Sequence, residues 1–156
     1  MGLQSDILGQ PVGELELRPL VTATATTTAR DAVRLMREND VGCVIVVDDA
    51  GKPQAKFTEK RLIHLLQDAP AGLEATIERF LVDLGGTVTL DDPVARVIEL
   101  IENQRSRFVC VTDQSGKAVA IVGQKSIMEY LTEHFPREVK VQAMESKLHM
   151  DQREGA

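Results

Sequence analysis

The sequence predicts an α/β fold built from two copies of one strand-helix-strand-strand-helix unit. In two apolar strand-turn segments, the turn residues Gly51 and Gly116 lie 65 positions apart, and Asp48 and Asp113 before them keep this offset. Apolar residues at helical spacing flank each of these segments. The offset of 65 matches further residues without a gap: Val12 with Ile77, Leu15 with Phe80, Thr24 with Thr89, Leu35 with Leu100, Lys60 with Lys125, and Leu66 with Leu131. One register over a whole unit indicates an internal duplication.

The duplication sets the expected domain boundaries. The copies span roughly 12–70 and 77–135, and Pro70 and Gly72 stop a helix in the linker between them. We predict three segments: a first domain with its lead-in and linker (1–72), a second domain (73–135), and a C-terminal tail (136–156). The tail has an irregular apolar pattern among charges, which fits either a docking helix or a partly ordered end.

Each copy opens with a short strand, 20–24 or 87–90, followed by a helix. Asp92 and Pro93 form a helix start, because a capping side chain precedes a proline whose fixed φ suits the first turn. We expect Thr27 to cap the equivalent helix in the first copy. Apolar residues then recur at helical spacing, Ala29, Ala32, Val33 and Met36 in one copy and Val94, Val97, Ile98 and Ile101 in the other.

The remaining elements of each copy are a middle strand, a glycine turn, a second strand and a last helix. The second strands are expected at 54–57 and 118–122. The middle strands are apolar at odd and even positions, which predicts that both of their faces are covered. One copy of about 60 residues would be marginal alone, so we expect the copies to pack against each other. The apolar stripes of the helices are wider than one contact needs, which favours a further contact between two chains.

Composition excludes several classes of function. The net charge of −6 opposes a phosphate backbone, so DNA or RNA binding is not expected. There is no signal peptide and no long apolar run, so we expect a cytoplasmic protein that does not enter a membrane. Cys43 and Cys110 lie in apolar runs and are interpreted as small core residues. No metal site is expected, since His64, His134 and His149 are too scattered to share one helix face.

The two copies carry the same series of motifs. In the first copy these are Val21-Thr22, Leu35-Met36, Val46-Val47-Asp48, Gly51 and Phe57-Thr58. In the second they are Val88-Thr89, Leu100-Ile101, Val111-Thr112-Asp113, Gly116 and Val122-Gly123. This duplicated series resembles a tandem pair of CBS (cystathionine-β-synthase) domains, a Bateman-type module.

The resemblance implies an architecture and a function. The two βαββα repeats would pack as a pseudo-twofold pair with two clefts between them, and two chains would form a homodimer. The module would be regulatory and not an enzyme, and it would require no cofactor. It would bind AMP, ADP, ATP or S-adenosylmethionine as a regulatory ligand. Because no catalytic domain accompanies the pair here, the resemblance implies a protein partner that acts in trans.

The ligand motif of the family, Gly-x-x-Thr/Ser-x-x-Asp, lies where the last strand meets the last helix. Here its hydroxyl survives only as Thr58, and its aspartate is replaced by Arg61 and Ser126. That aspartate accepts both ribose hydroxyls, because a carboxylate has two acceptor oxygens. Losing such a two-pronged contact weakens binding by roughly a hundredfold or more. We therefore do not expect the usual recognition of ribose.

The replacements suggest a different kind of recognition. Lys56, Lys60, Arg61, Arg107 and Lys125 are expected to face or flank the clefts, which favours a phosphate-rich ligand held by charge. The candidate ligand residues are Val21, Gly42, Thr58, Lys60, Arg61, Gly86, Arg107, Ile121, Lys125 and Ser126. Two alternatives stay open: these cations are solvated surface residues, or the module is a dimeric interaction platform whose nucleotide sites are degenerate.

Overall fold

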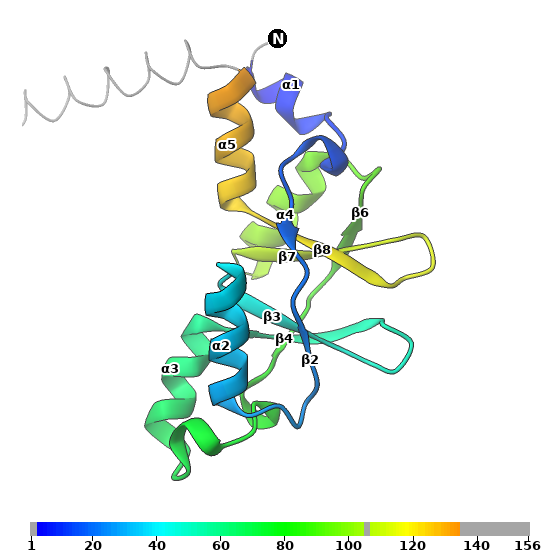
Figure 1. Cartoon of the computed structure of the whole chain (residues 1–156). Coiled ribbons are helices and arrows are strands. Elements are labelled where there is room, and N and C mark those ends of the chain that lie inside the picture. The colour runs from blue at the N-terminus through cyan, green and yellow to red at the C-terminus, as the bar shows by residue number, and fades with distance from the viewer. Residues whose placement is uncertain (1–2, 105–106, 135–156) are drawn as a thin grey trace, which may run out of the picture.

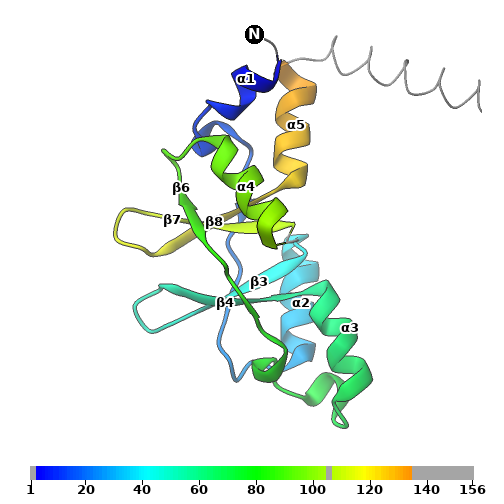
Figure 2. The same cartoon turned by 180° about the vertical axis from the view of Figure 1, so that it is seen from behind.

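The two repeats form two similar halves of one α/β molecule. The computed structural model describes residues 3–104 and 107–134 of the 156-residue chain. The halves lie one above the other, with their long helices on one side and two hairpins projecting on the other (Figure 1). Figure 2 shows the same division from behind. The predicted tail, 136–156, and His149 lie outside the described residues.

The halves repeat their elements in the predicted order. The first half contains β2 (Thr22–Ala23), α2 (Ala29–Asn39), β3 (Cys43–Val47), β4 (Pro53–Thr58) and α3 (Glu59–Asp68). The second half contains β6 (Thr87–Thr89), α4 (Val94–Gln104), β7 (Phe108–Thr112), β8 (Ala118–Gly123) and α5 (Gln124–His134). Each of these elements in the second half starts 65 positions after its counterpart, which confirms the duplication.

Two short strands that sequence analysis did not predict connect the halves. Strand β1 (Arg18–Pro19) precedes the first half but pairs with β8 of the second half. Strand β5 (Val82–Asp83) precedes the second half but pairs with β4 of the first. The strand orders are therefore β1-β8-β7-β6 in one sheet and β2-β3-β4-β5 in the other. Each sheet takes one edge strand from the segment that leads into the opposite half.

The segments around these strands are exchanged in the same way. Helix α1 (Leu3–Leu8) and a 3₁₀ turn, η1 (Val12–Glu14), pack on the second half, where Ile7 and Val12 join a core with Val94. Two further 3₁₀ turns, η2 (Gly72–Glu74) and η3 (Glu78–Phe80), follow α3, and η3 packs on the first half, where Ile77 beside it joins that core. The halves are thus interlocked as well as stacked.

The interior consists of one aliphatic core in each half and a third core between the two sheets. The third core contains Cys43 and Ile45 from β3 and Cys110 and Ile121 from β7 and β8. Both cysteines are buried, as predicted. Burial extends over both faces of β3 and β7, which confirms that each middle strand is covered on two sides.

The predicted helix caps are wrong by one residue. Helix α2 is capped by Thr28, whose hydroxyl accepts a hydrogen bond from Asp31 N at 3.2 Å. Thr27 instead accepts from Thr24 N at 3.1 Å, and Asp92 accepts from Thr89 N at 2.8 Å. Thr27 and Asp92 are equivalent, as expected. Each side chain accepts a hydrogen bond from the backbone N–H three residues earlier, and so stabilises the turn before the helix and not the helix start.

Replacing Thr28 with alanine is expected to lower the free energy of unfolding by about 1 kcal/mol, because an Asp31 N–H loses its acceptor. Urea unfolding followed by circular dichroism measures this change. Thr26→Ala is the control, since the Thr26 hydroxyl is exposed and bonds only to the exposed Thr24 hydroxyl. Equal losses in the two variants would contradict the capping role.

Candidate functional site

Two clefts open between the halves and are related by the offset of the duplication. Both are lined by the same four residues from the seam, Gly42, Glu59, Arg107 and Phe108. Cleft 1 has a volume of about 330 Å³ and is further lined by Arg18, Asp40, Ile121, Gln124, Lys125 and Ser126. Cleft 2 has a volume of about 650 Å³ and is further lined by Lys56, Thr58, Lys60, Arg61, His64 and Asp83. The structure thus contains the pair of clefts that the resemblance implied.

The clefts gather most of the residues proposed from the sequence. Gly42 and Arg107 line both clefts. Ile121, Lys125 and Ser126 line cleft 1, whereas Thr58, Lys60 and Arg61 line cleft 2. The assignment of these residues to a ligand stays a prediction.

Val21 and Gly86 do not line either cleft. Val21 is buried in the core of the first half, and its carbonyl accepts from Ile45 N at 2.9 Å. Gly86 lies beside α4, where an added Cβ would meet the Leu100 side chain at 2.8 Å. The positions of both residues are explained by packing.

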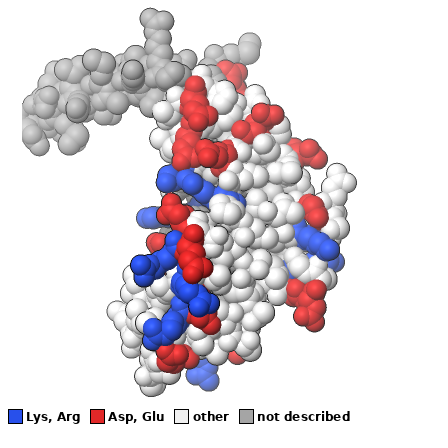
Figure 3. Space-filling view, in the orientation of Figure 1, with Lys and Arg blue, Asp and Glu red and all other residues white. Residues whose placement is uncertain are grey.

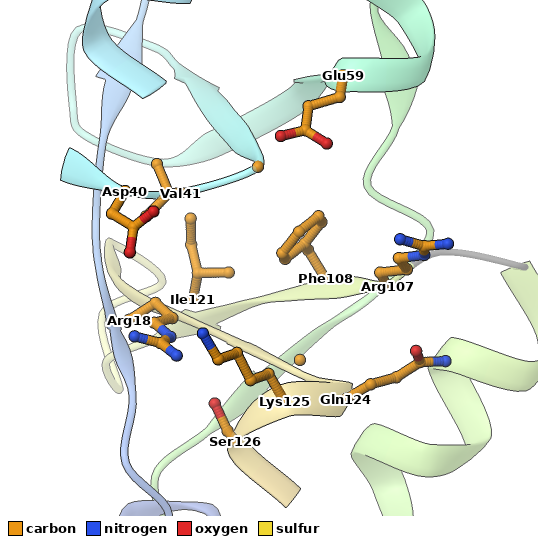
Figure 4. A pocket seen from close by; sticks show the side chains of 12 residues that line it. Arg18, Asp40, Val41, Glu59, Arg107, Phe108, Ile121, Gln124, Lys125 and Ser126 are labelled. Atoms are coloured by element: carbon orange, nitrogen blue, oxygen red, sulfur yellow. The ribbon is translucent and has the colours of Figure 1, made fainter. Parts of the chain in front are cut away.

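Charge is distributed unequally across cleft 1. Arg18, Lys125 and Ser126 lie on the wall formed by the second sheet and α5, whereas Asp40 and Glu59 lie on the wall formed by the first half (Figure 4). Arg18 Nη2 forms an ion pair with Glu129 Oε1 at 3.0 Å. Among the described residues, no acidic side chain pairs with Lys125. One wall of the cleft therefore carries a lysine with no acidic partner in the described part of the chain, and the other wall carries acidic groups.

Cleft 1 also holds a buried hydroxyl, that of Ser126. Ser126 is only 1% exposed, and its Oγ has no hydrogen-bond partner among the described residues. It lies in the first turn of α5, which begins directly after Gly123. A Cβ at Gly123 would lie 2.4 Å from the Arg107 carbonyl oxygen, so this position has no room for a capping side chain. The start of α5 therefore lacks a side-chain cap.

Cleft 2 differs at the equivalent positions. The Thr58 hydroxyl caps α3 by accepting from Arg61 N at 3.3 Å. The Arg61 guanidinium donates from Nε to Phe80 O at 3.0 Å and from Nη1 to His64 Nδ1 at 2.8 Å. It also lies over the Phe80 ring, 5.8 Å from the centroid. Arg61 is thereby fixed against η3, and only part of its hydrogen-bonding capacity remains for a ligand.

A buried lysine is among the residues that line cleft 2. Lys56 is 4% exposed, and its Nζ donates to Phe108 O at 3.0 Å. Burial lowers the pKa of Lys56 because the charged ammonium is poorly solvated there. Its counterpart in cleft 1 is the apolar Ile121. Equivalent positions therefore carry a lysine in one cleft and an apolar side chain in the other.

The two cysteines near Lys56 have protonated thiols at neutral pH. Burial raises the pKa of Cys43 to about 12, and the Lys56 charge opposes this shift. Burial raises the pKa of Cys110 to about 11 in the same way. Because the thiolate is the nucleophilic form, both residues are structural.

Sequence analysis missed several residues of the clefts. Arg18 and Asp83 belong to the exchanged strands β1 and β5, whose two-residue length leaves no periodic signal. Phe108 could have been noticed, because it is one of four phenylalanines and directly follows Arg107. Asp40 is marked only by its backbone φ of 51° at the end of α2, which the sequence does not display.

The surface and the described helices limit other functions. Basic and acidic side chains alternate along the helical edge, and this face has no continuous basic surface (Figure 3). Within residues 3–104 and 107–134, no three potential metal ligands are grouped. No helix in these ranges has the length and apolar character needed to cross a membrane.

Comparison with known proteins finds one family and several similar structures. The sequence model of the CBS domain matches twice, at residues 12–68 and 86–133. An uncharacterized protein from Methanopyrus kandleri is 27% identical over 133 residues, which cover 83% of this chain and 68% of that protein.

Two similar crystal structures contain ligands. A CBS domain pair in complex with 5′-methylthioadenosine and S-adenosyl-L-methionine is 21% identical, covers 80% of this chain and 97% of that chain, and has a TM-score of 0.70. A CBS domain protein from Pyrobaculum aerophilum complexed with AMP is 21% identical, covers 85% of this chain and 96% of that chain, and has a TM-score of 0.69. At these identities the comparison establishes the fold.

Proposed function

Because the chain belongs to the CBS domain family, we propose that it is a regulatory, non-catalytic module that binds a phosphate-containing ligand between its halves. The ligand is an adenine nucleotide or a related compound. The observation that carries this proposal is the pair of clefts at the seam, each with a lysine on the first turn of a helix and with Arg107 at its edge. AMP in one similar structure supports a phosphate-containing adenine compound. S-adenosyl-L-methionine in another has no phosphate and supports only the adenosine part of the ligand.

Charge is the principal means of recognition in this proposal. Arg61 and Ser126 stand at the positions where the family motif has the aspartate that accepts the ribose hydroxyls. Neither side chain can accept hydrogen bonds from both hydroxyls as a carboxylate does. Arg107, Lys60 and Lys125 supply positive charge around the clefts instead. Ligand bound at the seam would contact both halves and favour one arrangement of them, and a protein partner would respond to that arrangement in trans.

Thermal-shift measurements with adenine and guanine nucleotides and S-adenosylmethionine test the proposal. A ligand at about 100 times its Kd adds about 2.7 kcal/mol of stability. For a chain of this size, that corresponds to a rise in Tm of roughly 5–11 °C. We expect at least one adenine compound to give such a rise at low salt, and we expect added salt to reduce it because the contacts are ionic.

Arg107→Ala tests whether the clefts bind the ligand. Because Arg107 lines both clefts, the ligand-induced rise in Tm is expected to be smaller in this variant. An unchanged Tm with every compound would contradict ligand binding.

An unchanged Tm would favour the second candidate function, a dimeric interaction platform. This alternative is supported by Ile63 and Met128, equivalent residues on α3 and α5 that are 57% and 55% exposed. Light scattering on the same samples measures whether two chains associate.

A further inference from the structure

We propose that the start of α5, in cleft 1, is the oxyanion site of this chain, and that the equivalent start of α3, in cleft 2, is not. The inference rests on the proposed function and specifies it. One phosphate-type group of the ligand lies against the first turn of α5, formed by Gln124, Lys125 and Ser126. The two clefts are related by duplication, but only cleft 1 binds the phosphate-type group of the ligand.

The first argument is the difference between the two helix starts. First-turn N–H groups of a helix have no acceptor within the helix, which makes them donors for an anion. In α3 the Thr58 hydroxyl already accepts from Arg61 N. In α5 the equivalent residue is Gly123, and the nearby Arg107 carbonyl excludes any side chain there. The donors of α5 therefore lack the side-chain acceptor that α3 has.

The second argument is the buried Ser126 hydroxyl in cleft 1. A buried polar atom without a partner is unfavourable, and native structures satisfy most such atoms. Ser126 Oγ points toward the cleft from the same wall as the Lys125 ammonium (Figure 4). A ligand oxygen at this wall would satisfy the hydroxyl and pair with the lysine. The counterpart of Ser126 in cleft 2, Arg61, already has protein partners.

The surroundings of this site restrict the ligand to compounds with little negative charge. Asp40 and Glu59 line the opposite wall, so a chain of phosphates across the cleft would meet two carboxylates. The Glu129 carboxylate also lies on α5: its Oε1 accepts from Arg18, and its buried Oε2 has no partner among the described residues. The cleft volume of about 330 Å³ is at the small end of the range for ligand pockets, about 300–1,000 Å³.

These features define the class of ligand. It is a compact molecule with one terminal phosphate-type group and a neutral or cationic remainder. In terms of the proposed function, this predicts that AMP binds more tightly than ATP, because the additional phosphates of ATP would approach the acidic wall.

A titration of the ¹⁵N-labelled chain with inorganic phosphate, AMP, ATP and adenosine, followed by amide NMR, locates the site. We expect saturable shifts for phosphate and AMP that are largest at the amides of residues 124–126. Adenosine, which has no anion, is expected to leave these amides nearly unchanged, and ATP is expected to bind more weakly than AMP. The titration with inorganic phosphate tests binding of the oxyanion alone, and the titration with AMP tests binding of the complete ligand.

Two variants at the start of α5 add a readout that a structural role would not give. Lys125→Ala is expected to weaken AMP binding about tenfold, as is Ser126→Ala, because each removes one contact to an anion. Ser126→Ala is also expected to leave the Tm of the free protein unchanged or raised, since the lost hydroxyl has no hydrogen-bond partner within residues 3–104 and 107–134. Lys117→Ala, in the turn between β7 and β8 and outside the lining of both clefts, controls for the loss of one positive charge.

Several results would overturn the inference: phosphate shifts centred on residues 59–61, no saturable shift at 124–126, or a larger loss of affinity in Lys60→Ala than in Lys125→Ala. A lower Tm in Ser126→Ala with unchanged affinity would do the same. These failures differ from a failure of the proposed function. Nucleotide binding in cleft 2 alone would leave the proposed function standing, whereas phosphate binding at α5 without any preference for an adenine compound would leave only the inference.

Discussion

Replacing Leu65 with alanine is expected to lower the free energy of unfolding by about 3–5 kcal/mol. Leu65 lies on α3, is fully buried, and belongs to the core of the first half together with Phe57 and Ile77. Alanine would remove apolar contacts and leave a cavity that the interlocked halves can fill only in part. Urea unfolding measures the loss, and the Tm is expected to fall by roughly 2–4 °C for each kcal/mol.

The next residue supplies a matched control, because Leu66 is on the same helix and is 51% exposed. Leu66→Ala is expected to change stability by less than about 1 kcal/mol in a single chain. Equal losses in the two variants at a protein concentration where the chain is monomeric would contradict the orientation of α3. A loss at Leu66 that grows with protein concentration would instead place this residue in a contact between chains, because such stability depends on mass action.

The duplication was predictable because each half repeats strong local signals. A buried middle strand, a glycine turn and a helix with a wide apolar stripe recur at the offset of 65, and the structure repeats its elements at the same offset. The exchange of β1 and β5 was not predictable. Each is a two-residue edge strand whose pairing depends on where the opposite half lies, and a single sequence carries no signal for that.

The candidate site could be predicted at one edge and not at the other. The junction of the last strand and last helix was located from the motif, and Thr58, Lys60 and Lys125 at this junction line the clefts. The opposing wall, with Asp40, is formed by tertiary packing across the seam. The sequence also could not reveal that Lys56 turns into the interior, because a lysine on a strand end is usually exposed.

Single differences between equivalent positions explain why the two clefts are unlike. Gly123 in place of Thr58 leaves α5 without a side-chain cap, and Ser126 in place of Arg61 leaves a small hydroxyl where the other cleft has a guanidinium tied to Phe80. The shared backbone keeps both positions at the seam. A symmetric fold can thus hold one site for an anion while the other site has different chemistry.

Raising the pH from 9 to 11 is expected to destabilise the fold through Cys43 and Cys110. Burial raises the pKa of Cys43 to about 12 and that of Cys110 to about 11, from 9.0 for an unperturbed thiol. Above pH 9 the unfolded chain therefore releases protons that the folded chain retains, so the unfolding free energy falls as pH rises. Each thiol contributes a loss of about 1.4 kcal/mol per pH unit between its two pKa values. Unfolding in urea at several pH values measures the slope.

Lys56 acts in the opposite direction and must be separated from the thiols. Because burial lowers the pKa of Lys56, the unfolded chain holds this proton more strongly, and this group adds stability as pH rises toward 10.5. The Cys43→Ala/Cys110→Ala double variant removes the two thiols and keeps Lys56. Between pH 9 and 11, the unfolding free energy of this variant should fall less than that of the unmodified chain. The two decreases should differ by up to several kcal/mol. Parallel pH profiles for the two proteins would show that the thiols ionise alike in the folded and unfolded chains, contrary to their burial in the core between the sheets.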